Sequence, residues 1–83
     1  MKRVDEIIKQ TLHFPLDKKL SSDDGPENIY EWDSLAHVNI INSIEEEFNI
    51  TFSEEEIMQI KTLHDIYNLV KIKTDNYGKD SDK

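Results

Sequence analysis

Apolar residues recur every three or four positions in this chain, and that spacing constrains its fold more than any other feature does. In the first stretch Val4, Ile7, Ile8 and Leu12 fall on one face of a helix, and Pro15 follows. Proline lacks the amide that a helix interior needs, so the pattern predicts a helix over about residues 2–13.

A second stretch with the same spacing predicts a helix over about residues 34–48. Asp33 precedes it and can accept hydrogen bonds from the free amides of the first turn, which makes it the expected N-cap. One arc of the helical projection is the expected core face and consists of Ile40, Ile44, His37, Phe48 and Ile41. We expect His37, in the first turn of that arc, to be partly buried and hydrogen-bonded.

Two capping signals follow this helix. Ser53 and Glu56 match the capping box S-x-x-E and predict a short third helix through about residue 60. Thr62 and Asp65 form a weaker version of the same signal and predict the start of a fourth helix. The stripe that supports it through about residue 72 consists of Leu63, Ile66, Tyr67 and Val70.

Residues 14–32 break the helical pattern with turn-forming residues and predict a long first loop. Apolar residues that could pin this loop to the core are Phe14, Leu16, Leu20, Ile29, Tyr30 and Trp32. We therefore expect the loop to pack, with Trp32 as an apolar plug under its end. The predicted fold class is a small all-α four-helix bundle, with three longer helices and one short helix. Residues 1–73 would form one small domain and residues 74–83 a frayed or disordered tail.

Several functional classes are disfavoured by what the sequence lacks. It has no cysteine, which removes disulfides, thiolate metal sites and thiol nucleophiles. His13, His37 and His64 are far apart in sequence, and the acids around Gly25 do not match a calcium-loop spacing, so we expect no metal site. The charged N-terminus leads into no apolar run, which favours a cytoplasmic protein without membrane insertion.

The net charge of −8 is concentrated in one part of the chain. Residues 31–60 contain eight acidic residues and no Lys or Arg, whereas the rest has ten acids and ten bases. A field of this sign repels nucleic acid and anionic membranes, and it can attract a basic protein partner. The alternative is that these acids only solubilise the surface.

Ser34 lies where the loop becomes the second helix, with its hydroxyl at a helix N-terminus. Its surroundings supply no matched base, so we expect no catalytic residue and no enzyme. Leu35 and Val38 lie beside Ser34 on a second face that Glu45 and Glu46 border. This face suits a protein contact with an apolar centre and a charged rim, although Leu35 could instead pack under the loop.

The residues around Ser34 resemble an acyl carrier protein of the free-standing type. The resemblance rests on Trp32-Asp33-Ser34-Leu35, on the spacing of Val38, Ile41 and Ile44, and on the ending Glu45-Glu46-Glu47-Phe48-Asn49-Ile50. It covers about residues 2–72. It implies that 4′-phosphopantetheine is attached to Ser34, with Asp33 and Leu35 shaping the site. An acyl or aminoacyl group would then be carried as a thioester between enzymes of a biosynthetic pathway.

The resemblance also implies partners. A phosphopantetheinyl transferase using CoA and Mg²⁺ would modify a monomeric carrier, and loading and transfer enzymes with basic patches would bind it. The residues that match the recognition surface are Leu35, Val38, Glu45, Glu46, Glu31 and Glu54. Asn39 and Asn42 depart from a typical fatty-acid carrier and, with Trp32, point to a specialised pathway. The alternative from another class is an unmodified acidic helical adaptor that binds a basic protein.

Overall fold

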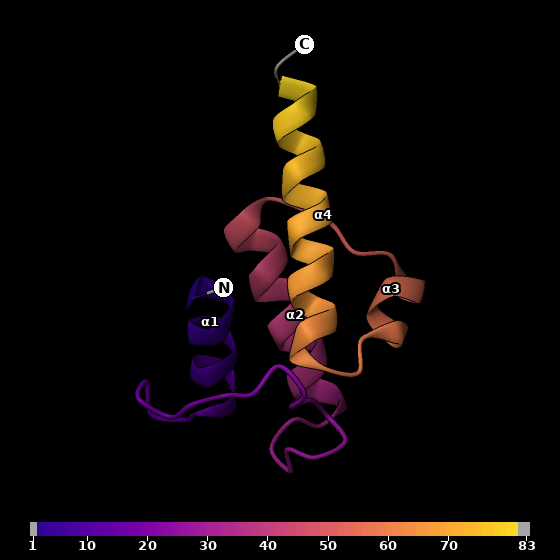
Figure 1. Ribbon diagram of the computed structural model, residues 1–83. Helices are drawn as coiled ribbons and strands as arrows, with labels where there is room; N and C mark the ends of the chain where they lie inside the picture. The colour runs from indigo at the N-terminus through magenta and orange to yellow at the C-terminus, as the bar shows by residue number, and fades with distance from the viewer. Residues whose placement is uncertain (1, 82–83) are drawn as a thin grey trace.

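Four helices, in the order expected from the sequence, make up the fold (Figure 1). The computed structural model describes residues 2–81, with side chains through Asp75. The helices are α1 (Lys2–Leu12), α2 (Ser34–Phe48), α3 (Glu54–Gln59) and α4 (Leu63–Ser81), and no strand occurs within residues 2–81. The prediction of a small all-α bundle with one short helix and a long first loop is confirmed.

The core is built from the apolar stripes that the helical spacing predicts. Val4 and Ile8 of α1 are fully buried, as are Ile40 and Ile44 of α2. The buried set is Val4, Ile7, Ile8, Leu12, Trp32, Ile40, Ile41, Ile44, Ile50, Phe52, Ile60, Leu63, Ile66 and Val70. Phe48 and Tyr67, which were also assigned to the stripes, are partly buried against this cluster. The stripes therefore locate one continuous core.

The caps predicted from sequence form in the structure. The carboxylate of Asp33 accepts a hydrogen bond from the Ala36 amide at 2.9 Å and starts α2. At α3, the Ser53 hydroxyl accepts from the Glu56 amide at 3.1 Å while the Glu56 carboxylate accepts from the Ser53 amide at 2.8 Å. Asp65 accepts from the Thr62 amide at 3.2 Å before α4. These local bonds fix where α2, α3 and α4 begin.

The long loop is anchored to the start of α4 and to the segment between α3 and α4. The Leu63 amide donates to the Asp24 carbonyl at 2.7 Å, and the His64 amide donates to the Ser22 carbonyl at 3.0 Å. Gly25 lies so close to this segment that a Cβ there would be 2.0 Å from the Lys61 carbonyl oxygen. The loop thus packs as predicted, and its backbone contacts the α3–α4 segment too closely for a side chain at position 25.

Only some of the expected loop anchors reach the core. Trp32 is buried, and Phe14, Leu20 and Ile29 pack partly against the cluster. Leu16 and Tyr30 were wrongly expected to pin the loop, since 63% and 95% of their surfaces are exposed. The backbone hydrogen bonds that the Ser22 and Asp24 carbonyls accept hold the loop in place without Leu16 and Tyr30.

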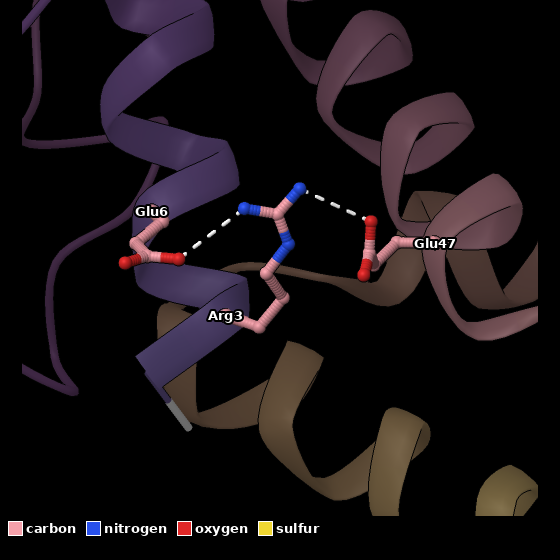
Figure 2. A network of polar contacts seen from close by, with 3 residues as sticks. All are labelled: Arg3, Glu6 and Glu47. Carbon is pink, nitrogen blue, oxygen red and sulfur yellow. Dashed lines mark hydrogen bonds and ion pairs between the residues drawn. The ribbon is translucent and has the colours of Figure 1, made fainter.

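Polar contacts between helices tie α1 to its neighbours. Arg3 donates to Glu6 on α1 at 3.2 Å and to Glu47 near the end of α2 at 3.1 Å (Figure 2). The Tyr67 hydroxyl of α4 donates to the Asp5 carboxylate of α1. Burial, followed by this bond to Asp5, raises the pKa of Tyr67. These contacts link α1 to both α2 and α4.

The end of α4 differs from the prediction. The helix was expected to end near Ile72, but it continues to Ser81 and projects beyond the other helices (Figure 1). Extending a formed helix costs far less than nucleating one, and the Thr74 hydroxyl donates back to the Val70 carbonyl at 2.8 Å. The division into a domain over residues 1–73 and a frayed tail over 74–83 stays a prediction, and residues 82–83 lie outside the described residues. None of the described helices combines the length and apolarity needed to cross a membrane.

Candidate functional site

Ser34 is the first residue of α2, and its side chain is exposed. The preceding residue caps the helix. The Asp33 side chain accepts a hydrogen bond from the Ala36 amide, and the Asp33 carbonyl accepts one from the His37 amide at 2.9 Å. The hydroxyl of Ser34 is therefore held at the positive end of a 15-residue helix. A group attached to this oxygen could extend into solvent without disturbing the core.

A surface groove of about 540 Å³ begins at Ser34. It runs between the start of α2 and α3, and its lining residues are Pro26, Trp32, Asp33, Ser34, His37, Val38, Ile57, Met58 and Ile60. Val38 and Met58 are 49% and 79% exposed, whereas Trp32 and Ile60 are buried. The groove therefore has exposed apolar side chains at its edges and buried ones at its base.

Trp32 and His37 are joined at the base of this groove. The Trp32 indole Nε1 donates to His37 Nδ1 at 3.0 Å, and His37 Nε2 lies 3.1 Å from the Ile57 carbonyl oxygen. An indole nitrogen can only donate, so Nδ1 must accept and Nε2 must carry the proton that bonds to Ile57. The prediction of a partly buried, hydrogen-bonded His37 is confirmed. Both ring nitrogens are occupied, which leaves neither free to act as a base toward Ser34.

Sequence reasoning did not find the pairing of Trp32 with His37. Counted from the cap at Asp33, these residues occupy the N′ and N4 positions, where a hydrophobic staple commonly packs across a helix start. Their rings lie 6.2 Å apart between centroids. The staple rule would have predicted their contact, although the hydrogen bond to α3 depends on the tertiary fold.

The apolar residues next to Ser34 face solvent. Leu35 is 71% exposed, so it does not pack under the loop, which was one of its two expected positions. Together with Val38 and Met58 it forms an exposed apolar patch beside the Ser34 hydroxyl; these three residues are called the apolar patch below. Met58 was not singled out from sequence, because its place beside α2 depends on how α3 packs.

The acidic residues expected to border this patch fall into two groups. Glu31, Glu46 and Glu54 are exposed. Glu45 differs, because its Oε2 accepts the Phe52 amide at 2.7 Å and closes the turn after α2. Glu47 is paired with Arg3. The structure thus gives Glu45 a structural contact within the fold, while Glu46 stays available at the surface.

Glu56 also has a structural contact. Its carboxylate accepts the Ser53 amide and pairs with Lys73 at 3.0 Å, and these two contacts, the backbone bond first, lower the pKa of Glu56. Lys73 also lies over an aromatic ring, with its Nζ 5.6 Å from the centroid of Phe52. No cluster of three or more His, Asp or Glu side chains suited to a metal ion occurs among the described side chains.

Comparisons with known proteins agree on one family. A family model described as a phosphopantetheine attachment site matches residues 2–70. The structure is similar to a holo acyl carrier protein from Geobacter metallireducens, with a TM-score of 0.83, 27% identity and coverage of 93% of this chain and 87% of that one. It is also similar to a candidate acyl carrier protein from Mycobacterium tuberculosis, with a TM-score of 0.78, 25% identity and coverage of 86% and 93% respectively.

Proposed function

This chain belongs to the acyl carrier protein family, which carries 4′-phosphopantetheine covalently, and on that premise we propose that Ser34 is the attachment residue. Members of the family are carriers and not enzymes. The observation that carries the proposal is the exposed hydroxyl of Ser34 at the start of α2, directly after a capping aspartate.

The residues at this position suit the prosthetic group. Attachment through a phosphodiester places a negative charge next to the first turn of α2, where backbone amides and the helix dipole stabilise an anion. Asp33 satisfies the Ala36 amide and so orients the turn that presents Ser34. When bound, the group supplies a thiol that holds cargo as a thioester, a chemistry that this chain without cysteine cannot supply itself.

Intact mass measurement tests the attachment residue. After incubation with a broad-specificity phosphopantetheinyl transferase, CoA and Mg²⁺, the wild-type protein should gain one phosphopantetheine. Ser34→Ala should gain none, while Ser22→Ala, a matched change at an exposed serine in the loop, should be modified like wild type. Modification of Ser34→Ala at the wild-type level would show that another residue carries the group.

We further propose that the loaded protein delivers an acyl or aminoacyl group between enzymes of a biosynthetic pathway in the cytoplasm, where CoA is available for its modification. The apolar patch next to Ser34 supports a docking role, because partner enzymes must reach the arm attached there. Glu31, Glu46 and Glu54 would form its charged rim and attract basic partner surfaces. Glu45 would contribute indirectly, by holding the turn that leads into α3.

The alternative is an unmodified adaptor that binds a basic protein through the same surface. It shares the apolar patch and the acids with the carrier hypothesis, but it does not require Ser34. The mass measurement separates the two, since an adaptor would remain unmodified and Ser34→Ala would bind its partner normally. The match to a phosphopantetheine attachment site supports the carrier.

A further inference from the structure

The base of the groove beside Ser34 is closed by side chains that hydrogen-bond to one another. Trp32 is only 1% exposed, although it lines the groove, so the space beneath the groove is filled by its indole ring. His37 links this ring to the Ile57 carbonyl and so connects the loop, α2 and α3. Passage from the groove into the core would require both hydrogen bonds to break.

The core around this closure is also filled. Ile40 and Ile41, one turn further along α2, are 0% and 1% exposed, and Ile60 at the groove base is 4% exposed. Protein cores packed in this way hold few voids larger than a water molecule. A chain that entered would have to displace Trp32 and then separate α3 from α2.

We propose that Trp32 and His37 act as a depth stop that keeps thioester-bound cargo out of the core and limits this carrier to small acyl or aminoacyl groups. This inference rests on the proposed function of Ser34 and specifies its cargo. Burial of one methylene group would shift the equilibrium between a sheltered and an exposed chain by about fourfold. A long chain that stays in solvent lacks this stabilisation, so it gains little from this carrier. A small group loses little by remaining in the open groove.

The orientation of His37 is essential to this depth stop. Its ring can satisfy both the Trp32 donor and the Ile57 acceptor only in the tautomer with hydrogen on Nε2. An aliphatic residue at position 37 would leave the indole nitrogen and the carbonyl without these partners. His37 is therefore a positioning residue: it holds Trp32 and α3 in place and need not touch the cargo.

Cleavage of the thioester by hydroxylamine tests the proposal. A phosphopantetheinyl transferase would load the protein from acetyl-CoA or octanoyl-CoA, and intact mass would verify each product. The cleavage rate of each loaded protein would be divided by that of the matching free acyl-pantetheine. We expect both ratios for wild type to lie within about twofold of one, because neither chain is sheltered. A protein that takes up no acyl-phosphopantetheine at all would instead contradict the proposed function.

Three variants assign the effect to the depth stop. His37→Ala removes both hydrogen bonds, and we expect at least threefold slower cleavage of its octanoyl thioester with little change for acetyl. Trp32→Phe keeps most of the ring volume but loses the hydrogen-bond donor. It should therefore slow cleavage of the octanoyl thioester relative to wild type, but by less than His37→Ala does. Asn39→Ala, an exposed change on the same helix, should behave like wild type.

Two results would overturn the proposal. Tenfold or greater protection of the octanoyl thioester in wild type would mean that a long chain already enters the core, whatever the variants do. Equal cleavage of octanoyl thioesters in wild type and in folded His37→Ala would mean that this pair does not limit the depth. Far-ultraviolet circular dichroism would verify folding, and if His37→Ala does not fold, Trp32→Phe provides the same comparison.

Discussion

Replacing Gly25 by alanine tests how the long loop is held in place. A Cβ at this position would be 2.0 Å from the Lys61 carbonyl oxygen, 2.9 Å from its carbonyl carbon and 3.1 Å from the Thr62 Cα. All three are backbone atoms, so no side chain can rotate away to make room. Either the added methyl group strains both segments, or the loop separates from the α3–α4 segment.

The loss of stability in Gly25→Ala can be estimated for each of these two outcomes, strain and separation. Overpacking of this kind costs about 1–3 kcal/mol. Separation would break the Leu63–Asp24 and His64–Ser22 backbone bonds, and two such bonds are together worth about 1–3 kcal/mol. The variant adopts whichever of the two outcomes has the lower free energy, so the two free-energy costs do not add. Alanine also lowers the conformational entropy of the unfolded chain, which offsets about 0.4–1 kcal/mol of this loss. Mid-range values of about 2 kcal/mol for the cost and about 0.7 kcal/mol for the offset predict that Gly25→Ala lowers the free energy of unfolding by about 1.3 kcal/mol.

Urea denaturation followed by tryptophan fluorescence measures this loss. Trp32 is the only tryptophan and is 1% exposed, so its emission should shift to longer wavelength when the protein unfolds. For a chain of this length, the expected loss is a sizeable part of a total of about 4–12 kcal/mol. Glu27→Ala, at an exposed position in the same loop, is the matched control and should change stability by less than about 0.5 kcal/mol. If Gly25→Ala proves as stable as wild type, the close packing inferred for this loop is wrong.

The remaining predictions concern acidic residues. Asp33→Ala should lower the free energy of unfolding by about 0.5–2 kcal/mol in urea denaturation through loss of the cap; an unchanged midpoint would contradict the role of the Ala36 bond. Glu46→Lys should slow phosphopantetheinylation at low salt without loss of stability. Glu45→Lys should slow it too, but should also destabilise the fold by about 1–3 kcal/mol, because the Phe52 amide loses its acceptor. Equal stability of the two variants in urea denaturation would refute this distinction. The pKa of Glu56 is lowered in the folded state, so its contribution is present above the usual value of 4.5 and is lost as the pH falls through the folded value. Unfolding free energies of wild type and Glu56→Gln should therefore converge as the pH falls below 4.5 and through the lowered folded pKa, and a gap that does not narrow on acidification would contradict the assignment.

Features encoded within a few residues could be predicted from the sequence. The caps at Asp33 and Ser53 formed as expected, because each bond joins residues three positions apart. The buried stripes were predicted for a similar reason, since helical geometry fixes which side chains share a face. Ser34 could be located at the start of α2 because its neighbour determines where that helix begins.

Features that depend on distant contacts could not be predicted in this way. The Glu45 carboxylate binds the Phe52 amide only because the chain reverses direction at Asn49, which adopts a left-handed conformation with φ of 56°. The groove requires α3 to pack next to the first turn of α2, and no local pattern specifies that packing. Tyr30 was misplaced because a hydrophobic residue in a loop does not reveal which side of the backbone faces the core.

The acid-rich segment over residues 31–60 therefore does not act as a uniform charged surface. Four of its eight acids accept hydrogen bonds within the fold, namely Asp33, Glu45, Glu47 and Glu56. The other four are exposed and form no ion pair among the described residues, namely Glu31, Glu46, Glu54 and Glu55. Association with a basic partner should depend on the second group, because only those carboxylates can change partners without a cost to the fold. The salt dependence of binding should consequently decrease when the second group is neutralised, whereas neutralising the first group should act mainly through stability.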